Sequence, residues 1–192
     1  MTDAYIRPSI PVSLAHRPTV GGLVAPWVNV TLADGGIDFR TTHHAKWVQA
    51  WTQGVCQTCG EPLRLRPVVF LGGPNQLATY FTEPPLHSWC AAYAEQACPM
   101  VAGRLPTYAD REELAHGKRG QTCPDPGCDC GGWTPHPGGS THYGAPAHEW
   151  WAVWAHDWTL AASPEGELLG GVPTGQVKRR LVSTPPQQEA TP

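Results

Sequence analysis

Two close pairs of residues with metal-ligand chemistry stand near the middle of the chain. Cys56 and Cys59 are separated by two residues, and so are His87 and Cys90. Thiolates and imidazoles are the ligands that tetrahedral zinc takes in structural sites, and this paired spacing is typical of them. Gly60, directly after the second cysteine, permits a tight turn of the backbone behind the metal. The sequence therefore predicts that these two pairs bind one zinc ion.

The segment between and after the two pairs predicts how they are brought together. Residues 67–71 form an apolar run typical of a buried strand, and 78–82 are expected to be its partner in a β-hairpin. A helix is predicted over 86–97, beginning at the second ligand pair and ending before a proline. The order of knuckle, hairpin and helix predicts a treble-clef-like zinc module over about residues 54–99.

Further short elements precede this module. Residues 23–33 alternate in polarity as a strand does, and 37–39 form a short return strand after a glycine-rich turn. A helix over 43–53 has its apolar side chains on one face and is expected to be capped by Thr41 or Thr42. This helix delivers the chain to the first ligand pair.

The domain organisation follows from composition. Residues 1–20 are rich in proline and are expected to lie on the surface or to be disordered. A strand at 148–162 and a return strand at 168–172 close the single zinc-containing domain, which spans 21–172. The remainder, 173–192, is polar and is predicted to be a disordered tail. The whole is predicted to be a small, loop-rich α+β domain with a treble-clef-like module and additional short strands.

A second group of candidate metal ligands lies later in the chain. Three cysteines fall within eight positions, and a loop rich in proline and glycine folds back between them. A fourth ligand has to come from elsewhere, from the end of the preceding helix or from the histidines that follow. The members of this candidate second zinc site are Cys98, Cys123, Cys128, Cys130 and His136, with His142 as a further alternative.

The first site is closed by its four protein ligands, so its predicted role is to stabilise the fold rather than to activate water. Catalysis needs an open position, which only three ligands at the second site would leave. In that case Asp129 or Glu149 is the candidate base of a zinc-dependent hydrolase. Nuclease chemistry of the kind found on treble clefs is not expected. His43 and His44 precede the knuckle and diverge by about 100° on a helix, which predicts exposed positions.

Nucleic-acid binding is the other alternative that the residues leave open. The net charge is −3, and the predicted helix at 86–97 carries Glu95 and no lysine or arginine. These observations favour a protein partner over nucleic acid, because phosphate contacts are made mainly by lysine and arginine. With seven cysteines and neither a secretory leader nor a membrane span in evidence, a cytoplasmic location without membrane attachment is expected.

Four stretches of sequence are distinctive: LAHRPTVGGLVAPWVNV, the knuckle CQTCG, the block LHSWCAAYAEQACPM and the motif GCDCGGW. They resemble a group of uncharacterised zinc-binding proteins of actinobacteria and their phages. The resemblance covers most of residues 14–170 and is most specific over Cys56 to Pro99. It implies zinc binding and no particular activity. The sequence therefore predicts a zinc-binding, non-catalytic binding or scaffold protein.

Overall fold

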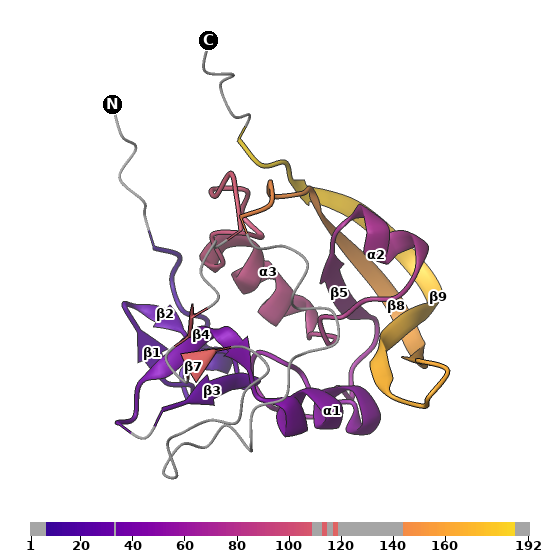
Figure 1. Ribbon diagram of the computed structural model, residues 1–192, viewed down its shortest axis with the longest axis horizontal. Helices are drawn as coiled ribbons and strands as arrows, with labels where there is room; N and C mark the ends of the chain where they lie inside the picture. The colour runs from indigo at the N-terminus through magenta and orange to yellow at the C-terminus, as the bar shows by residue number, and fades with distance from the viewer. Residues whose placement is uncertain (1–6, 33, 109–112, 115–116, 119–143, 187–192) are drawn as a thin grey trace.

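Short helices and short antiparallel strands share the chain, and the architecture is of the mixed α+β kind that the sequence predicts (Figure 1). The computed structural model describes residues 7–32, 34–108, 113–114, 117–118 and 144–186. The elements, in chain order, are η1 (Val12–Leu14), β1 (Thr19–Val20), β2 (Leu23–Val24), β3 (Asn29–Thr31), β4 (Ile37–Thr42), α1 (His44–Gln53), β5 (Val68–Gly72), α2 (Pro74–Ala78), α3 (Ser88–Ala97), β6 (Glu113–Leu114), β7 (Gly117–Lys118), β8 (Trp150–Ala162) and β9 (Leu168–Ser183).

A three-stranded antiparallel sheet with the order β5-β8-β9 organises the larger part of the fold (Figure 1). Every residue of β5 is buried, as its apolar run predicts. On one side β5 pairs with β8, where Phe70 lies opposite Val153. On the other side Val69 exchanges two backbone hydrogen bonds with Leu86, of 2.9 and 2.8 Å. Strand β5 is thus tied directly to the residue that precedes the second ligand pair. The remaining strands pair as the two-stranded sheets β1-β2, β3-β4 and β6-β7.

The indole ring of Trp51 is central to the packing of α1 on this sheet. It stacks on Phe70, with ring centroids 6.1 Å apart, and meets Trp158 edge-on at 6.4 Å. Gly171 of β9 makes room for it, since a Cβ atom there would lie 2.3 Å from the Trp51 ring. Truncating a buried aromatic side chain of this kind costs about 3–5 kcal/mol. The apolar face predicted for the first helix is the face that packs on the sheet.

The start of α1 differs from the prediction. His43 is the N-cap residue, and no side chain caps the helix by a hydrogen bond. Thr41 instead donates its hydroxyl to Asp38 Oδ2 at 2.8 Å. The predicted threonine cap is wrong because β4 continues to Thr42, beyond the predicted return strand at 37–39.

The single strand predicted at 23–33 is replaced by two shorter ones, β2 and β3. Between them, Trp27 and Val28 donate their backbone N–H groups to the carbonyls of Thr58 and Gln57, at 3.0 and 3.1 Å. Thr58 and Gln57 belong to the loop that carries the first ligand pair. The alternating polarity of residues 23–33 does not show that the backbone at Trp27 and Val28 forms hydrogen bonds with this loop and not with another strand.

The partner strand predicted at 78–82 is wrong, and α2 takes its place ahead of an irregular segment. Pro74 occupies the first turn of α2, where its missing N–H has no cost. Gln76 accepts a hydrogen bond through its side-chain oxygen from the backbone N–H of Gly73, at 2.9 Å, and so closes the first turn. The predicted β-hairpin therefore does not form, and β5 finds its ladder partner in β8.

Both ends of the chain are more involved in the fold than predicted. Leu14, in the proline-rich arm, is fully buried in the core. At the other end β9 runs to Ser183, so the boundary expected at residue 172 lies inside a strand. The prediction of a disordered tail is therefore wrong for residues 173–183, because these residues pair with the long strand β8. Residues 1–6 and 187–192 lie outside the described ranges.

Candidate metal centre

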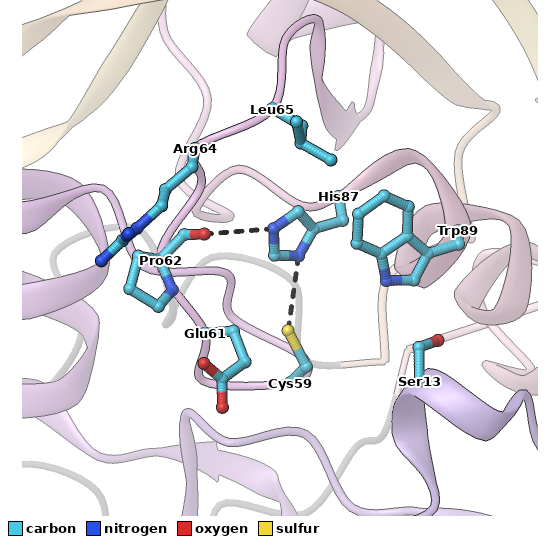
Figure 2. A pocket seen from close by; sticks show the side chains of 8 residues that line it. All are labelled: Ser13, Cys59, Glu61, Pro62, Arg64, Leu65, His87 and Trp89. Atoms are coloured by element: carbon cyan, nitrogen blue, oxygen red, sulfur yellow. Dashed lines mark hydrogen bonds between the residues drawn. The ribbon is translucent and has the colours of Figure 1, made fainter.

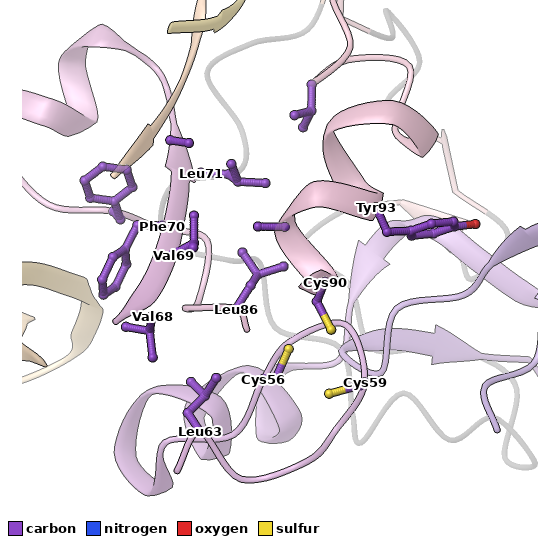
Figure 3. Close-up of a cluster of buried hydrophobic side chains, with 14 of the residues drawn as sticks. Cys56, Cys59, Leu63, Val68, Val69, Phe70, Leu71, Leu86, Cys90 and Tyr93 are labelled. Carbon is purple, nitrogen blue, oxygen red and sulfur yellow. The ribbon is translucent and has the colours of Figure 1, made fainter. Parts of the chain in front are cut away.

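The four side chains of the two predicted ligand pairs converge at one buried position. One ligand atom from each of Cys56, Cys59, His87 and Cys90 lies within 4.8 Å of all the others. Figure 3 shows the three cysteine side chains directed toward a common centre, next to the apolar side chains of β5. The cysteine side chains are at most 5% exposed and His87 is 6% exposed, so water is nearly excluded from the group.

The first pair is presented by a tight loop that follows α1. Gly54 ends the helix in the left-handed conformation, with φ 66°. Within the loop the Cys56 N–H bonds the carbonyl of Glu61, and the Gly60 N–H bonds the carbonyl of Cys56, both at 2.9 Å. Gly60 has φ 81°, and a Cβ atom on it would lie 2.7 Å from the Trp27 ring. Two reasons thus favour glycine at position 60: its left-handed backbone conformation and the close approach of the Trp27 ring.

The second pair is presented by the start of α3. His87 is the N-cap residue, and its carbonyl accepts the first helical hydrogen bond from Ala91 at 2.9 Å. Cys90 lies three positions later, so the two side chains share one face of the first turn. This helix end therefore orients both candidate ligands toward the same centre.

The hydrogen bonds of His87 show which ring nitrogen faces the cysteines. Its Nε2 lies 3.3 Å from the carbonyl oxygen of Pro62, which can only accept, so Nε2 carries the proton and donates. Its Nδ1 lies 3.4 Å from the Cys59 Sγ and directs its lone pair toward that sulfur. A histidine ligand is commonly fixed by such a bond from its second nitrogen. Nδ1 is accordingly the ligand atom of this histidine.

Protonation of the three thiols is strongly interdependent. Burial by itself raises the pKa of Cys56, but hydrogen bonds from Cys59 and Cys90 outweigh it and hold that pKa well below its ordinary value. Hydrogen bonding to Cys56 and Cys59 raises the pKa of Cys90, and burial adds to the effect. Three thiols this close cannot all ionise unless a cation compensates their charge. A coordinated cation removes that conflict because metal-bound thiols are deprotonated.

The donor set fits a soft or borderline divalent ion. Three sulfurs and one imidazole nitrogen match the Cys₃His sites of structural zinc, whose bonds of about 2.0–2.3 Å hold ligand atoms roughly 4 Å apart. The spread of 4.8 Å here is close to that requirement. The four residues could therefore hold a metal ion such as zinc, with every coordination position taken by the protein.

The N-terminal arm lies against this centre, which the sequence did not predict. His16 Nε2 lies 3.2 Å from the carbonyl oxygen of Cys59 and donates to it. Arg17 donates two hydrogen bonds to the carbonyl of Ala25, at 3.2 and 3.3 Å. Burial lowers the pKa of Arg17, while the nearby Cys59 acts in the opposite direction. Three thiolates and one divalent ion sum to one negative charge, and Arg17 is a neighbouring positive charge.

A recess of about 410 Å³ opens beside the ligands Cys59 and His87 (Figure 2). The Trp89 ring stacks on the His87 ring at one side of it, with centroids 4.4 Å apart and planes inclined by 8°. Leu65 and Trp89 are 65% and 40% exposed, which is unusual for large apolar side chains. Arg64 also lines the recess. The recess thus joins an apolar rim to the outer surface of the candidate metal centre.

The other candidate residues have different outcomes. Cys98 is the C-cap residue of α3, half-buried, at the opposite end of that helix from His87, and burial raises its pKa. Its proposed partners lie outside the described residues; they are Cys123, Cys128, Cys130, His136 and His142. The second zinc site, and the hydrolase that depends on it, therefore stay predictions. Within the described ranges, the Cys₃His group is the one cluster suited to a metal ion.

Two histidine environments differ from expectation or were missed. His43 is 7% exposed rather than on the solvent side, because as the N-cap residue it bonds back to Val28 through its N–H, at 2.7 Å. His44 is exposed, as predicted. His148 accepts a hydrogen bond from the Tyr108 hydroxyl at 2.7 Å through Nε2, and its Nδ1 donates to the carbonyl of Glu149. The sequence carried no signal for that pair, since the two residues are far apart in the chain.

Comparison with known proteins gives no match: no family model, no curated protein and no solved structure is similar to this chain. The resemblance to zinc-binding proteins of actinobacteria and phages therefore stays a prediction. Among the helices that the structure describes, none has the length and apolar character needed to cross a membrane.

Proposed function

We propose that the protein is a zinc-stabilised, non-catalytic binding protein. Its zinc would be held by Cys56, Cys59, His87 and Cys90 in a treble-clef-like module whose hairpin is reduced to one contact between β5 and the segment before α3. The observation that carries this proposal is the closed, buried Cys₃His cluster, with all four ligand atoms within 4.8 Å. A site with four protein ligands leaves no position for a reactive water, so its role is structural.

The position of the cluster supports a structural role. The two ligand pairs enclose β5, whose residues are all buried, and the cysteines belong to the same packed cluster as Leu63, Val68 and Leu86 (Figure 3). A zinc ion there would close the chain segment that contains β5. Zinc-binding energy then becomes folding energy, because the unfolded chain has no preformed site.

Metal content tests the zinc assignment. Purified protein should contain zinc, and Cys59→Ser should lose one equivalent per chain and unfold at a clearly lower temperature. Cys98→Ser is the matched control, since it also removes one thiol but lies outside the cluster of four. It should keep the first equivalent of zinc. Full zinc occupancy in Cys59→Ser would contradict the assignment.

A protein partner is the ligand class that the surface next to this site fits. The recess beside His87 is bordered by Leu65 and Trp89, which expose apolar surface that a monomer usually covers. An aliphatic or aromatic side chain of a partner could enter the recess, while Arg64 and Glu61 at its border would form polar contacts at the rim. The rigid metal cluster behind it would hold the recess in shape.

Site-specific photocrosslinking in cells tests the binding role. A benzophenone side chain placed at Leu65 should yield a discrete crosslinked product with a protein partner. The same group placed at Val172, also exposed but on β9, is the control and should not yield that product. Equal crosslinking from both positions, or none from Leu65, would contradict a partner site at the recess.

A further inference from the structure

Three consecutive carbonyl groups of the metal-ligand loop (residues 56–60) accept hydrogen bonds from an earlier part of the chain. They belong to residues 57–59. The backbone N–H groups of Val28 and Trp27 donate to the first two, at 3.1 and 3.0 Å, and His16 Nε2 donates to the third at 3.2 Å. The loop is therefore the backbone partner of the segment between β2 and β3, and it also holds the segment between η1 and β1.

These hydrogen bonds join two parts of the fold that otherwise pack mainly within themselves (Figure 1). We call η1 and the strands β1 to β4 the N-terminal module, and we call α1, α3 and the sheet β5-β8-β9 the sheet part. Packing between elements is concentrated in β5-β8, β8-β9, α3-β5 and α1-β9 within the sheet part, and in β1-β2 and β3-β4 within the module.

The module has further contacts with the sheet part beyond the metal-ligand loop. The side chain of Leu14 is buried in the common core, and the Val24 N–H donates to the Tyr93 hydroxyl at 2.9 Å. His43, between β4 and α1, donates its N–H to the carbonyl of Val28 at 2.7 Å. These contacts are spread along the module, whereas the loop gathers three hydrogen bonds at three adjacent residues. The metal-ligand loop is thus a principal connection between the two parts.

The geometry of this loop depends on its centre. The side chains of Cys56 and Cys59 point inward to the position shared with the second ligand pair, while the carbonyls bond the module on the outside (Figure 3). Gln57 and Thr58, between the two ligands, are 8% and 4% exposed, so the loop is enclosed between the two parts of the fold. A zinc ion would hold both sulfurs about 2.3 Å from one point and so fix the directions of the carbonyls. Without the ion, the neighbouring thiols restrain the loop far less, because thiolates repel one another.

The core of the sheet part is held by contacts that do not involve the loop. Trp51 contacts both Phe70 and Trp158, and the rings of Phe70 and Phe81 lie 5.5 Å apart. β5 is held on one side by β8 and on the other by Leu86. Segments of one protein open with different free energies, and isolated two-stranded sheets are marginally stable. The N-terminal module, built from two such sheets, is therefore the part expected to open first.

We propose that zinc occupancy controls the docking of the N-terminal module: the zinc-loaded loop holds the module, and loss of the ion releases it while the sheet part stays folded. This inference rests on the zinc site proposed above and adds a regulatory consequence to it. Ser13 of the module lines the recess beside Cys59 and His87. Release of the module therefore removes one wall of the recess, so a partner that binds there would be retained only by the zinc-loaded protein.

Hydrogen–deuterium exchange of the full chain, followed by mass spectrometry, tests the proposal at one pH, with zinc and after chelation. Peptides that cover residues 23–31 should exchange at least about tenfold faster without zinc, because their N–H groups lose the loop carbonyls. Peptides from β5 and from residues 151–155 of β8 should change by less than about twofold. Zinc content is measured on the same samples, so a protein that binds no zinc is distinguished from one whose module stays docked.

A matched pair of histidine variants tests the coupling from the other direction. If zinc holds the module, the module must also favour zinc binding, since coupling between two sites is reciprocal. His16→Ala removes one hydrogen bond to the loop and should weaken zinc binding about fivefold in competition with a chromophoric chelator. With saturating zinc, peptides that cover 23–31 should still exchange faster in this variant than in the natural protein. His156→Ala, which changes an exposed histidine of β8, is the control and should alter neither quantity.

Failure of the zinc site and failure of the docking inference give different results. A natural protein that binds no zinc would overturn the zinc site and this inference together. Bound zinc, with an equal rise in the exchange of both parts after chelation, would overturn this inference alone, since zinc would then support one cooperative unit. Unchanged exchange of 23–31 after verified loss of zinc, or equal zinc affinity of the two histidine variants, would also overturn this inference alone.

Discussion

The ring of Trp89 lies parallel to the ring of His87, with centroids 4.4 Å apart and planes inclined by 8°. This contact holds the candidate metal ligand from one face, while the hydrogen bond from Nε2 to Pro62 holds it at its edge. The imidazole is therefore fixed in both tilt and rotation before any metal binds. Residues that orient a ligand in this way affect metal affinity without touching the metal.

We expect Trp89→Ala to weaken zinc binding by about tenfold, because the freed imidazole must be ordered when the metal binds. Competition with a chromophoric zinc chelator measures the change. Trp89→Phe, which keeps an aromatic ring, should recover most of the affinity. Leu65→Ala also removes apolar area from the recess but does not touch the ring stack, and it should leave zinc affinity unaltered. A similar loss in the two alanine variants would show that ring stacking is not the cause.

A second prediction concerns Tyr108, whose hydroxyl donates to His148. Burial raises its pKa to about 12, and the negative charges of Glu83 and Cys98 act in the same direction. A folded-state pKa above the ordinary value of 10 means that the folded protein holds this proton more tightly. The associated stability is complete below about pH 10 and is lost as the pH rises through 12.

The absorbance of tyrosinate near 295 nm should therefore show one tyrosine that ionises with a pKa of about 12. The Tyr108→Phe variant should lack this late step, and its free energy of unfolding should fall less steeply between about pH 10 and pH 12. If the Tyr108→Phe variant still shows this late ionisation step, the step belongs to another tyrosine and the prediction is wrong.

The sequence predicted those features that depend on local spacing. The pairs Cys56/Cys59 and His87/Cys90 were found because two-residue gaps place both side chains on one side of a loop or a helix turn. The helices α1 and α3 were predicted within one or two residues at each end, since their apolar positions repeat with helical period. These features require no knowledge of distant partners.

The features that were missed depend on long-range pairing. An apolar run predicts that β5 is buried, but it does not say whether its partner follows at once or, like β8, lies much later in the chain. The same limit applies to the tail, because the polar sequence around Lys178 reads as disordered unless a long neighbouring strand is known. The hydrogen bond from His16 to Cys59 and the electrostatic interaction of Arg17 with Cys59 could not be predicted for the same reason.

Acidification should release the zinc and with it the stability that zinc supplies. Hydrogen bonds hold the pKa of Cys56 below the ordinary value of 9.0, so its ionisation contributes stability that is complete above pH 9 and lost as the pH falls through the lowered value. Metal binding also lowers the apparent pKa of all three thiols, because only the thiolate binds the metal. The melting temperature should thus fall steeply between about pH 8 and pH 5, and a chelator at pH 8 should reproduce the fall. In Cys59→Ser the steep fall should be absent, and its persistence there would assign it to other groups.

The tight loop behind the first ligand pair offers a matched comparison of two glycines. Gly60 and Gly35 have nearly the same backbone conformation, with φ 81° and 82°. A Cβ atom on Gly35 would meet nothing within 4 Å, whereas on Gly60 it would lie 2.7 Å from the ring of Trp27. The left-handed conformation alone costs an alanine about 1–2 kcal/mol, and this cost is shared by both positions. Any excess at Gly60 therefore reports the contact between Trp27 and the metal-ligand loop.

We expect Gly35→Ala to lower the free energy of unfolding by about 1 kcal/mol, and Gly60→Ala by about 3 kcal/mol or more, since overpacking adds its own cost. Denaturant unfolding of both variants with saturating zinc measures the difference. The double variant Gly60→Ala/Trp27→Ala removes the clash, so the alanine at position 60 should then cost no more than the alanine at position 35. Equal losses for the two single variants would mean that Trp27 moves aside freely and does not constrain the loop that presents Cys56 and Cys59.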